Sequence, residues 1–134
     1  MSGWIDISLT IQIVLYISDD SKVVGLILAK PITLAYRLQE TNHESVSTDS
    51  QQSISLSYNQ SDPVEAICGI SRIWVHETHR RQKIATLMLD SLRKEFLYGV
   101  ELTTSQIAFS QPTRMGQSLA TAYFSRHDFL VYVD

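Results

Sequence analysis

Apolar, β-branched residues fill two segments near the start of the chain, and both segments predict β-strands. They span residues 11–18 and 22–38, and the polar run Asp19–Ser21 separates them. A short polar turn between two such segments is typical of a β-hairpin. Pro31 cannot donate a hydrogen bond to a neighbouring strand, so it predicts a bulge or bend within the second segment.

A polar segment interrupts this pattern over residues 40–63. It has few apolar side chains and is rich in Ser, Gln, Asn and Thr. Such a composition cannot bury enough apolar surface to order itself, so we expect a long, exposed and partly disordered loop. An insertion without a function of its own is the simpler interpretation of this loop.

The second half of the chain begins with a nearly continuous apolar segment over residues 64–77, which predicts a central strand covered on both faces. A helix is expected directly after it, because apolar residues then recur at a period of 3.6. They stand at positions 84, 85, 88, 89, 92 and 96. Gly99 suits the position just past the end of this helix.

Three shorter elements complete the predicted order. Residues 106–110 indicate a buried strand, residues 115–124 a second helix, and residues 129–133 a final strand. The order is therefore β-β-loop-β-α-β-α-β, which belongs to the α/β (α+β) class. The length of 134 residues and the hydrophobic share of 44% fit a single domain with a sizeable core.

The charge distribution indicates a local anion site rather than a basic surface. The net charge is −3 and the pI is about 5.7, which argues against a general nucleic-acid binder. Six of the 11 Lys and Arg residues nevertheless cluster, at positions 72, 80, 81, 83, 93 and 94. Local positive charge in an acidic protein suits one small anionic ligand.

Cysteine, histidine and hydropathy limit the other classes of site. Cys68 is the only cysteine, so this chain can form neither an internal disulfide nor a zinc site made of cysteines. The four histidines lack a metal-ligand spacing, apart from His76 and His79, and we expect no metal. No apolar run reaches the roughly 20 residues of a membrane span, and we expect a soluble intracellular protein.

The junction between the central strand and the first helix has the residues of a phosphate site. The first N–H groups of a helix and the positive end of its dipole attract anions. Arg80, Arg81, Gln82 and Lys83 stand at this point, where a diphosphate would fit. Neither GxGxxG nor GxxxxGK[ST] occurs, so the sequence gives no support for dinucleotide binding or nucleotide hydrolysis. A solvated basic start of a surface helix remains the alternative.

The motif Arg80-x-x-Lys83-x-Ala85 resembles the Arg/Gln-x-x-Gly-x-Gly/Ala signature of the GNAT acetyltransferase superfamily, with Lys83 in place of the usual glycine. Its flanks make the resemblance more specific. CGISRIWV at 68–75, IAFSQPT at 107–113, GQSLATAYF at 116–124 and FLVY at 129–132 follow in the order of the cohesion-establishment acetyltransferases. That family acetylates a lysine pair on the cohesin ATPase head. Residues 1–10 lie outside the resemblance, and we expect a truncated or divergent amino end.

The resemblance implies a GNAT fold: a mixed, mostly antiparallel sheet with helices on both faces and a splayed central strand pair. Acetyl-CoA would lie where the strand over residues 67–76 diverges from the next one. The backbone near Ile73, Trp74 and Val75 would pair with the pantetheine arm. The implied cofactor-binding set also includes Arg80, Arg81, Gln82, Lys83, Ile84, Ala85, Ser110, Leu119, Ala120 and Tyr123.

The resemblance implies catalytic roles on both sides of the thioester. Tyr123 stands where many GNAT enzymes keep a tyrosine that protonates the departing thiolate, although a core-edge aromatic is the alternative. Ser71 and Arg72 interrupt the apolar central strand, and strand alternation sends at least one of them towards the cleft. Ser71 would hydrogen-bond the acceptor lysine or relay its proton, and a satisfied core serine is its alternative interpretation.

The reaction also needs a general base. A free lysine has a pKa near 10.4, so a side chain or a water molecule must take its proton. Vertebrate family members carry Ser-Asp-Pro-Thr where this chain has Ser110-Gln111-Pro112-Thr113. Gln111 cannot accept a proton, although it can hydrogen-bond the amine. Asp90 occupies an acidic position of the family, with a surface acid paired to Lys94 as the alternative. His76, Glu77 and His79 are further candidate bases.

The leading hypothesis is an acetyl-CoA-dependent lysine acetyltransferase acting on the cohesin ATPase head in sister-chromatid cohesion, in the nucleus. Two alternatives are an inactive module that retains the cofactor pocket and a GNAT enzyme for another amine. We expect no direct nucleic-acid or membrane binding. The zinc finger and sliding-clamp segment of the family are not part of this sequence.

Overall fold

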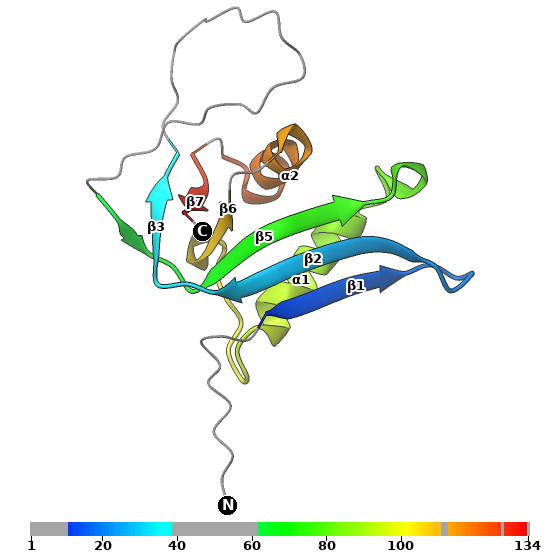
Figure 1. Ribbon diagram of the computed structural model, residues 1–134, viewed down its shortest axis with the longest axis horizontal. Coiled ribbons are helices and arrows are strands. Elements are labelled where there is room, and N and C mark those ends of the chain that lie inside the picture. The colour runs from blue at the N-terminus through cyan, green and yellow to red at the C-terminus, as the bar shows by residue number, and fades with distance from the viewer. Residues whose placement is uncertain (1–10, 39–61, 111–112, 127, 134) are drawn as a thin grey trace, which may run out of the picture.

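The computed structural model describes residues 11–38, 62–110, 113–126 and 128–133. These residues form a twisted sheet with two α-helices packed against it (Figure 1). The strands are β1 (Gln12–Ile17), β2 (Val23–Pro31), β3 (Leu34–Arg37), β4 (Val64–Glu65), β5 (Cys68–Val75), β6 (Ile107–Ser110) and β7 (Leu130–Tyr132). The helices are α1 (Ile84–Glu95) and α2 (Arg114–Phe124), with short 3₁₀ helices η2 (Glu77–His79) and η3 (Thr104–Gln106). The predicted order from the first helix onward, α-β-α-β, is confirmed, whereas five strands precede that helix where three were predicted.

The strand order in the sheet is β1-β2-β5-β6-β7-β3-β4. β5 pairs with β6 and β6 with β7 in parallel, and the other four neighbouring pairs are antiparallel. The prediction of a mixed, mostly antiparallel sheet is therefore confirmed. The polar turn between β1 and β2 forms the expected hairpin, in which Ser21 adopts a φ of 63°.

Two long apolar segments each divide into two strands, contrary to the sequence prediction. The segment 22–38 bends after Pro31, so β2 pairs with β1 and β5 while β3 pairs with β7 and β4. The segment 64–77 breaks at residues 66 and 67, between β4 and β5. Apolar character is continuous through both breaks because the connecting residues Ala66 and Ile32 also pack into a core cluster. Most of the polar segment 40–63 lies outside the described residues.

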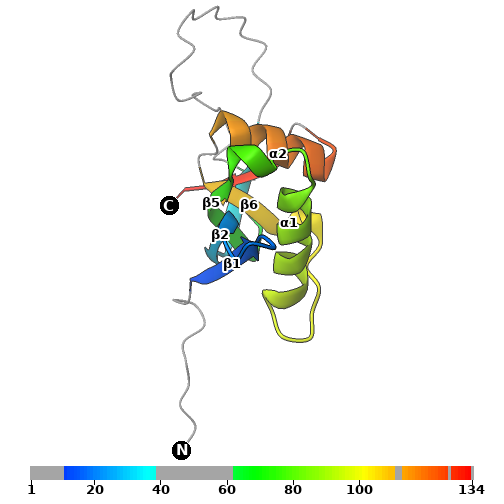
Figure 2. The same ribbon diagram turned by 90° about the vertical axis from the view of Figure 1, so that its right-hand side faces the viewer.

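The helices cover one face of the sheet in the described part of the chain, whereas helices on both faces were expected. α1 and α2 both contribute to the larger core cluster, together with Ile70 and Phe109. The smaller cluster, around Ala108 and Tyr132, contains strand and connecting residues. The reason is topological: β5, β6 and β7 lie in sequence order, so two right-handed crossovers in the same direction place both helices on the same face (Figure 2).

Helix α1 packs as its periodicity predicts. All six stripe residues are buried: Ile84, Ala85, Met88, Leu89, Leu92 and Phe96. Gly25 in β2 makes room for the helix, because a Cβ there would lie 2.9 Å from Cε of Met88. The predicted terminus is wrong, since Phe96 caps the helix and Gly99, with a φ of 76°, lies in the following turn. The result is a firmly seated helix whose N-terminus meets the end of β5.

Candidate active site

Strands β5 and β6 diverge at the middle of the sheet, as the sequence predicts. Their ladder ends with the pair Ile70 and Phe109, while β5 continues to Val75 on its pairing with β2. Ser71 and Ser110 are thus the first residues past the last rung. Beyond this point the backbone edge of β5 that faces β6 has no partner strand among the described residues. Such an edge can pair with an extended ligand.

A β-bulge sets the direction of the polar residues in β5. Leu28 of β2 pairs with Arg72 and Ala29 pairs with Ile70, which leaves Ser71 as the extra residue. An extra residue breaks the strict alternation of side chains. Ser71 and Arg72 are consequently both exposed, and the Ser71 hydroxyl donates to the Leu28 carbonyl at 3.4 Å. The bulge interrupts the strict alternation of Ser71 and Arg72, and the interpretation of Ser71 as a core serine is wrong. That at least one of the two points towards the cleft stays a prediction.

The three residues expected to face the pantetheine arm differ in their side-chain environment. Ile73 is half-buried, Trp74 is 36% exposed, and Val75 is buried. The exposed half of β5 contradicts the expectation of a strand covered on both faces, as far as the described residues go. Trp74 stacks edge-on against His76, with ring centroids 5.9 Å apart. Any ligand contact by Val75 is therefore a backbone contact.

The short helix η2 holds the candidate bases His76, Glu77 and His79 at the end of β5. The hydroxyl of Thr78 lies 2.8 Å from Nδ1 of His76 and 2.8 Å from Nδ1 of His79. His76 Nδ1 also accepts from the Thr78 N–H at 3.2 Å. These bonds engage Nδ1 of both rings and stabilise the turn. The roles of His76, Glu77 and His79 as candidate bases stay predictions.

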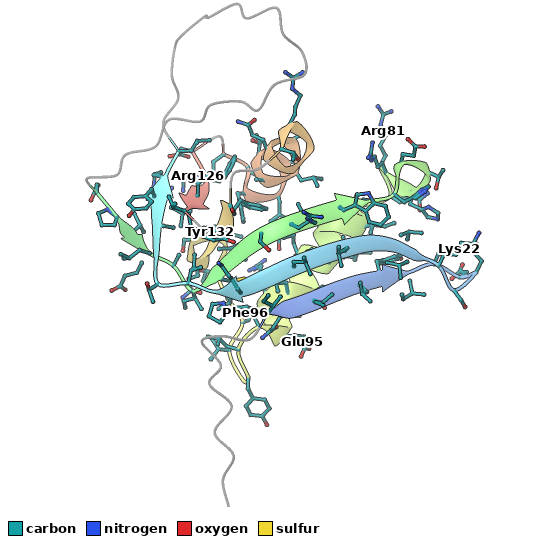
Figure 3. All side chains as sticks on the ribbon, in the orientation of Figure 1. Lys22, Arg81, Glu95, Phe96, Arg126 and Tyr132 are labelled. Carbon is teal, nitrogen blue, oxygen red and sulfur yellow. The ribbon has the colours of Figure 1, made fainter. Side chains whose placement is uncertain are left out.

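The loop from Arg80 to Lys83 turns the chain between η2 and α1. Arg81 and Lys83 have φ values of 66° and 60°, which places both in the left-handed region. Where left-handed residues alternate with right-handed helical ones, successive backbone N–H groups point to one side and can bind an anion. Arg80 is anchored, because its Nε donates to the Val75 carbonyl at 3.2 Å. Figure 3 shows Arg81 projecting from this turn at the end of β5.

The electrostatics of this loop favour a phosphate-bearing ligand. Arg81, Gln82 and Lys83 are exposed, and α1 has no acidic residue in its first turn to neutralise them. Ile84 and Ala85 are buried by their side chains, so they offer only backbone N–H groups. The helix dipole adds positive potential at the same place. The loop and the helix start together can hold a diphosphate.

Helix α2 forms part of the wall on the other side of the divergence. Ala120 is buried, and Leu119, Tyr123 and Phe124 pack against the larger core cluster. Thr113 caps the helix, since its hydroxyl accepts from the Gly116 N–H at 3.2 Å. Ser110 is half-buried at the end of β6, opposite Tyr132 of β7. Gln111 lies outside the described residues, so its predicted role stays a prediction.

Tyr123 and Asp90, which the sequence assigns to separate roles, are brought together. The Tyr123 hydroxyl donates to Oδ1 of Asp90 at 2.5 Å, and Nη1 of Arg93 donates to the same hydroxyl at 3.0 Å. Burial and the bond to Asp90 raise the pKa of Tyr123. The expected surface pair of Asp90 with Lys94 is wrong, because its ion pair is with Arg93, 3.8 Å away.

Arg93 is the residue that sequence reasoning missed. It lies three positions after Asp90, a spacing at which helical side chains are neighbours, and this signal was available in the sequence.

In the described part of the chain, no cluster of three His, Cys, Asp or Glu residues could hold a metal. None of the described helices has the length and hydropathy needed to cross a membrane.

Comparison with known proteins gives consistent similarities. Residues 64–132 match the family model described as ESCO1/2 acetyl-transferase. The chain is 42% identical to human N-acetyltransferase ESCO2 and 43% identical to human N-acetyltransferase ESCO1, each over 125 residues. These matches cover 91% and 88% of this chain but 20% and 14% of the two proteins. The chain therefore spans a fifth or less of these two curated relatives.

Solved structures agree in fold. The xEco2 acetyltransferase domain bound to a CoA conjugate matches with a TM-score of 0.76 and 41% identity, over 90% of this chain and 66% of that chain. The structure of the same domain described without the conjugate matches with a TM-score of 0.77. The predicted family resemblance and the fold are confirmed by these comparisons.

Proposed function

This chain belongs to the ESCO1/2 acetyltransferase family, and on that basis we propose that it transfers the acetyl group of acetyl-CoA to a lysine side chain of a protein. The observation that carries the proposal is the junction of β5 and α1. There, a diverging strand edge and a cationic loop with two left-handed residues lie in succession. A CoA thioester has an extended arm and a diphosphate, which these two features can bind in that order.

Different residues of the chain would bind the diphosphate and the pantetheine arm of the cosubstrate. The N–H groups from Gln82 to Ala85, with the cations Arg81 and Lys83, would hold the diphosphate. The backbone of Ile73 and the N–H of Val75, on the edge of β5 away from β2, would hold the pantetheine arm and polarise the thioester carbonyl. The anchoring of Arg80 to the Val75 carbonyl supports this division, because it ties the loop to the strand.

The proposed reaction is a direct transfer. The neutral amine of the acceptor lysine attacks the thioester carbonyl, the C–N bond forms, the C–S bond breaks, and the proton of the amine passes to a base or to water. Ser71 is exposed at the divergence and could hydrogen-bond the amine. Cys68 is unsuited to a covalent intermediate, because its side chain is fully buried and burial raises its pKa to about 12.

The finer function rests on the family. The acceptor that we propose is a lysine of the cohesin ATPase head, and the proposed role is the establishment of sister-chromatid cohesion in the nucleus. The similarity to N-acetyltransferase eso1 of Schizosaccharomyces pombe, at 38% identity over 109 residues, supports a function that the family shares.

The test is isothermal titration of the 134-residue chain with acetyl-CoA, followed by acetylation of a recombinant cohesin-head fragment read by mass spectrometry. We expect binding, and new acetyl-lysine on the fragment. Arg81→Ala is expected to weaken binding, and Lys94→Ala, which removes the same charge at the far end of α1, is the matched control. Absence of acetyl-CoA binding would contradict the proposal.

One observation favours a second candidate, a module that binds acetyl-CoA but transfers it poorly. Gln111 stands where family members carry aspartate, and glutamine cannot take the proton of the amine. Gln111→Asp distinguishes the candidates. If the chain is a weakened enzyme, this variant raises kcat at unchanged acetyl-CoA affinity. An equal kcat in both forms means that another group or water takes the proton.

A further inference from the structure

Three polar side chains join the two helices near the divergent strands. Asp90 and Arg93 extend from α1, and Tyr123 extends from α2. Tyr123 donates to Asp90 at 2.5 Å and accepts from Arg93 at 3.0 Å, so its hydroxyl is engaged as both donor and acceptor. The Arg93 guanidinium also lies over the Tyr123 ring, 6.0 Å from its centroid.

Arg93 extends this cluster to a third segment of the chain. Its Nε donates to the Leu102 carbonyl at 2.8 Å, and its Nη2 lies 3.9 Å from Oε1 of Glu101. Residues 101 and 102 lead through η3 into β6, the strand that ends at Ser110. One guanidinium therefore ties α1 both to α2 and to the approach to β6.

The position of the cluster relates it to the site. The N-terminus of α1 supplies the anion-binding loop, whereas β6 and α2 form the opposite side of the strand divergence. Asp90 and Arg93 lie about two to three helical turns further along α1 than this loop. The hydrogen bonds at this level join α1, which follows the loop, to α2 on the opposite side.

The hydrogen bonds also restrict the chemistry of Tyr123. Its proton is directed at a carboxylate, and burial together with that bond raises its pKa. A general acid needs a free path for its proton to the leaving group and a pKa near the working pH. Neither condition is met in this arrangement, which differs from the thiolate-protonating role expected from the sequence.

We propose that Asp90, Arg93 and Tyr123 form a positioning clamp that fixes the separation of the two sides of the acetyl-CoA site, and that Tyr123 acts as part of this clamp rather than as the proton donor. The inference rests on the proposed function for the identity of the ligand. The clamp itself is a property of the chain without ligand, so the two can fail separately.

The test combines Tyr123→Phe, Asp90→Ala and the double variant in the 134-residue chain. With acetyl-CoA and the cohesin-head fragment, we expect each single variant to raise KM for acetyl-CoA about three- to tenfold, the usual cost of one lost hydrogen bond. We expect kcat to change less than about twofold and its pH profile to keep its shape. Asp90→Asn, which retains an acceptor oxygen, should recover part of the affinity.

Non-additivity is the signature of a clamp, because each variant removes the same bond. The double variant should bind acetyl-CoA no more weakly than the worse single variant. Tyr98→Phe is the matched control, since Tyr98 is fully exposed. A loss of kcat of a hundredfold or more in Tyr123→Phe, with KM unchanged and an altered alkaline limb, would overturn the inference in favour of a general acid.

Urea unfolding of the same variants without ligand separates this inference from the proposed function. The clamp predicts that the shifts in unfolding midpoint caused by Tyr123→Phe and Asp90→Ala are smaller together than their sum. Additive shifts would overturn the clamp even if acetyl-CoA binds. Non-additive shifts in a chain that fails to bind acetyl-CoA would retain the clamp and refute the proposed function.

Discussion

Replacing Lys83 by glycine is expected to make the chain more stable while weakening its hold on acetyl-CoA. Lys83 caps α1 with φ 60° and ψ 22°, and its side chain makes no capping hydrogen bond. A side chain in the left-handed region costs roughly 1–2 kcal/mol. The greater freedom of glycine in the unfolded chain offsets about 0.5–1 kcal/mol of that. Removing a cation from the N-terminus of the helix adds a few tenths of a kcal/mol to the gain.

The net gain is roughly 0.5–1 kcal/mol in the free energy of unfolding, or about 2–4 °C in Tm for a domain of this size. Binding should move the other way. An exposed cation near a diphosphate contributes up to about 1 kcal/mol, so acetyl-CoA affinity should fall about two- to fivefold, and less at high salt. Urea or thermal unfolding measures the first effect, and titration at two salt concentrations measures the second.

Lys94→Gly is the matched control for this prediction. Lys94 is an exposed lysine within α1, so the substitution removes the same charge from helical backbone. It should destabilise the chain by about 0.5–1 kcal/mol, because glycine disfavours the helix, and leave acetyl-CoA binding unchanged. The two glycine variants thus differ in the sign of their effect on stability. If Lys83→Gly lowers Tm as Lys94→Gly does, the argument from backbone conformation is refuted.

Three further predictions concern packing, ionisation and binding. Gly69→Ala should lower the free energy of unfolding by about 1–3 kcal/mol in urea titrations, because the new Cβ would lie 2.7 Å from Cε1 of Tyr132. An unchanged unfolding midpoint would contradict this packing. Cys68, with its pKa raised by burial to about 12, should resist dithionitrobenzoate at pH 8.5 until urea is added. The folded Cys68 thiol binds its proton more tightly than the unfolded one, so the protonated thiol stabilises the fold below about pH 9. This contribution to the free energy of unfolding falls by up to about 1.4 kcal/mol per pH unit as the pH rises towards 12. The fall in stability should be absent in Cys68→Ala. Arg81→Ala should weaken acetyl-CoA binding with a smaller salt dependence than the unmodified chain shows, and an unchanged Kd would contradict the anion loop.

Periodicity was a good guide to the elements because burial of one helical stripe or one strand face leaves a regular pattern. The stripe of α1 from Ile84 to Phe96 is an example, since every predicted position is buried. The pattern could not locate the breaks after Pro31 and at Ala66, because their neighbours pack into a second cluster and remain apolar. Strand pairing, which separates β2 from β3, depends on partners that are distant in the sequence.

The candidate site shows the same division between local and distant information. The anion loop from Arg80 to Lys83 was predictable, because its chemistry is contained in four consecutive residues. The orientation of Ser71 was not, because a one-residue bulge against β2 turns it outward. The partnership of Asp90 with Tyr123 spans 33 residues and two helices, and no local pattern encodes such a contact.

The pKa values of the two reacting groups indicate which proton transfer of the proposed reaction needs catalysis. An alkyl thiol has a pKa of about 8.5, whereas the acceptor ammonium has a pKa of about 10.4, so near neutral pH the thiolate is an adequate leaving group while the amine is rarely neutral. A proton donor at the sulfur would therefore accelerate the transfer less than a group that deprotonates the lysine. Tyr123, engaged by Asp90 and Arg93, can serve the geometry of the site without supplying a proton. The proposed transfer is therefore expected to respond more to changes at the groups that meet the acceptor amine, such as Ser71, than to loss of the Tyr123 hydroxyl.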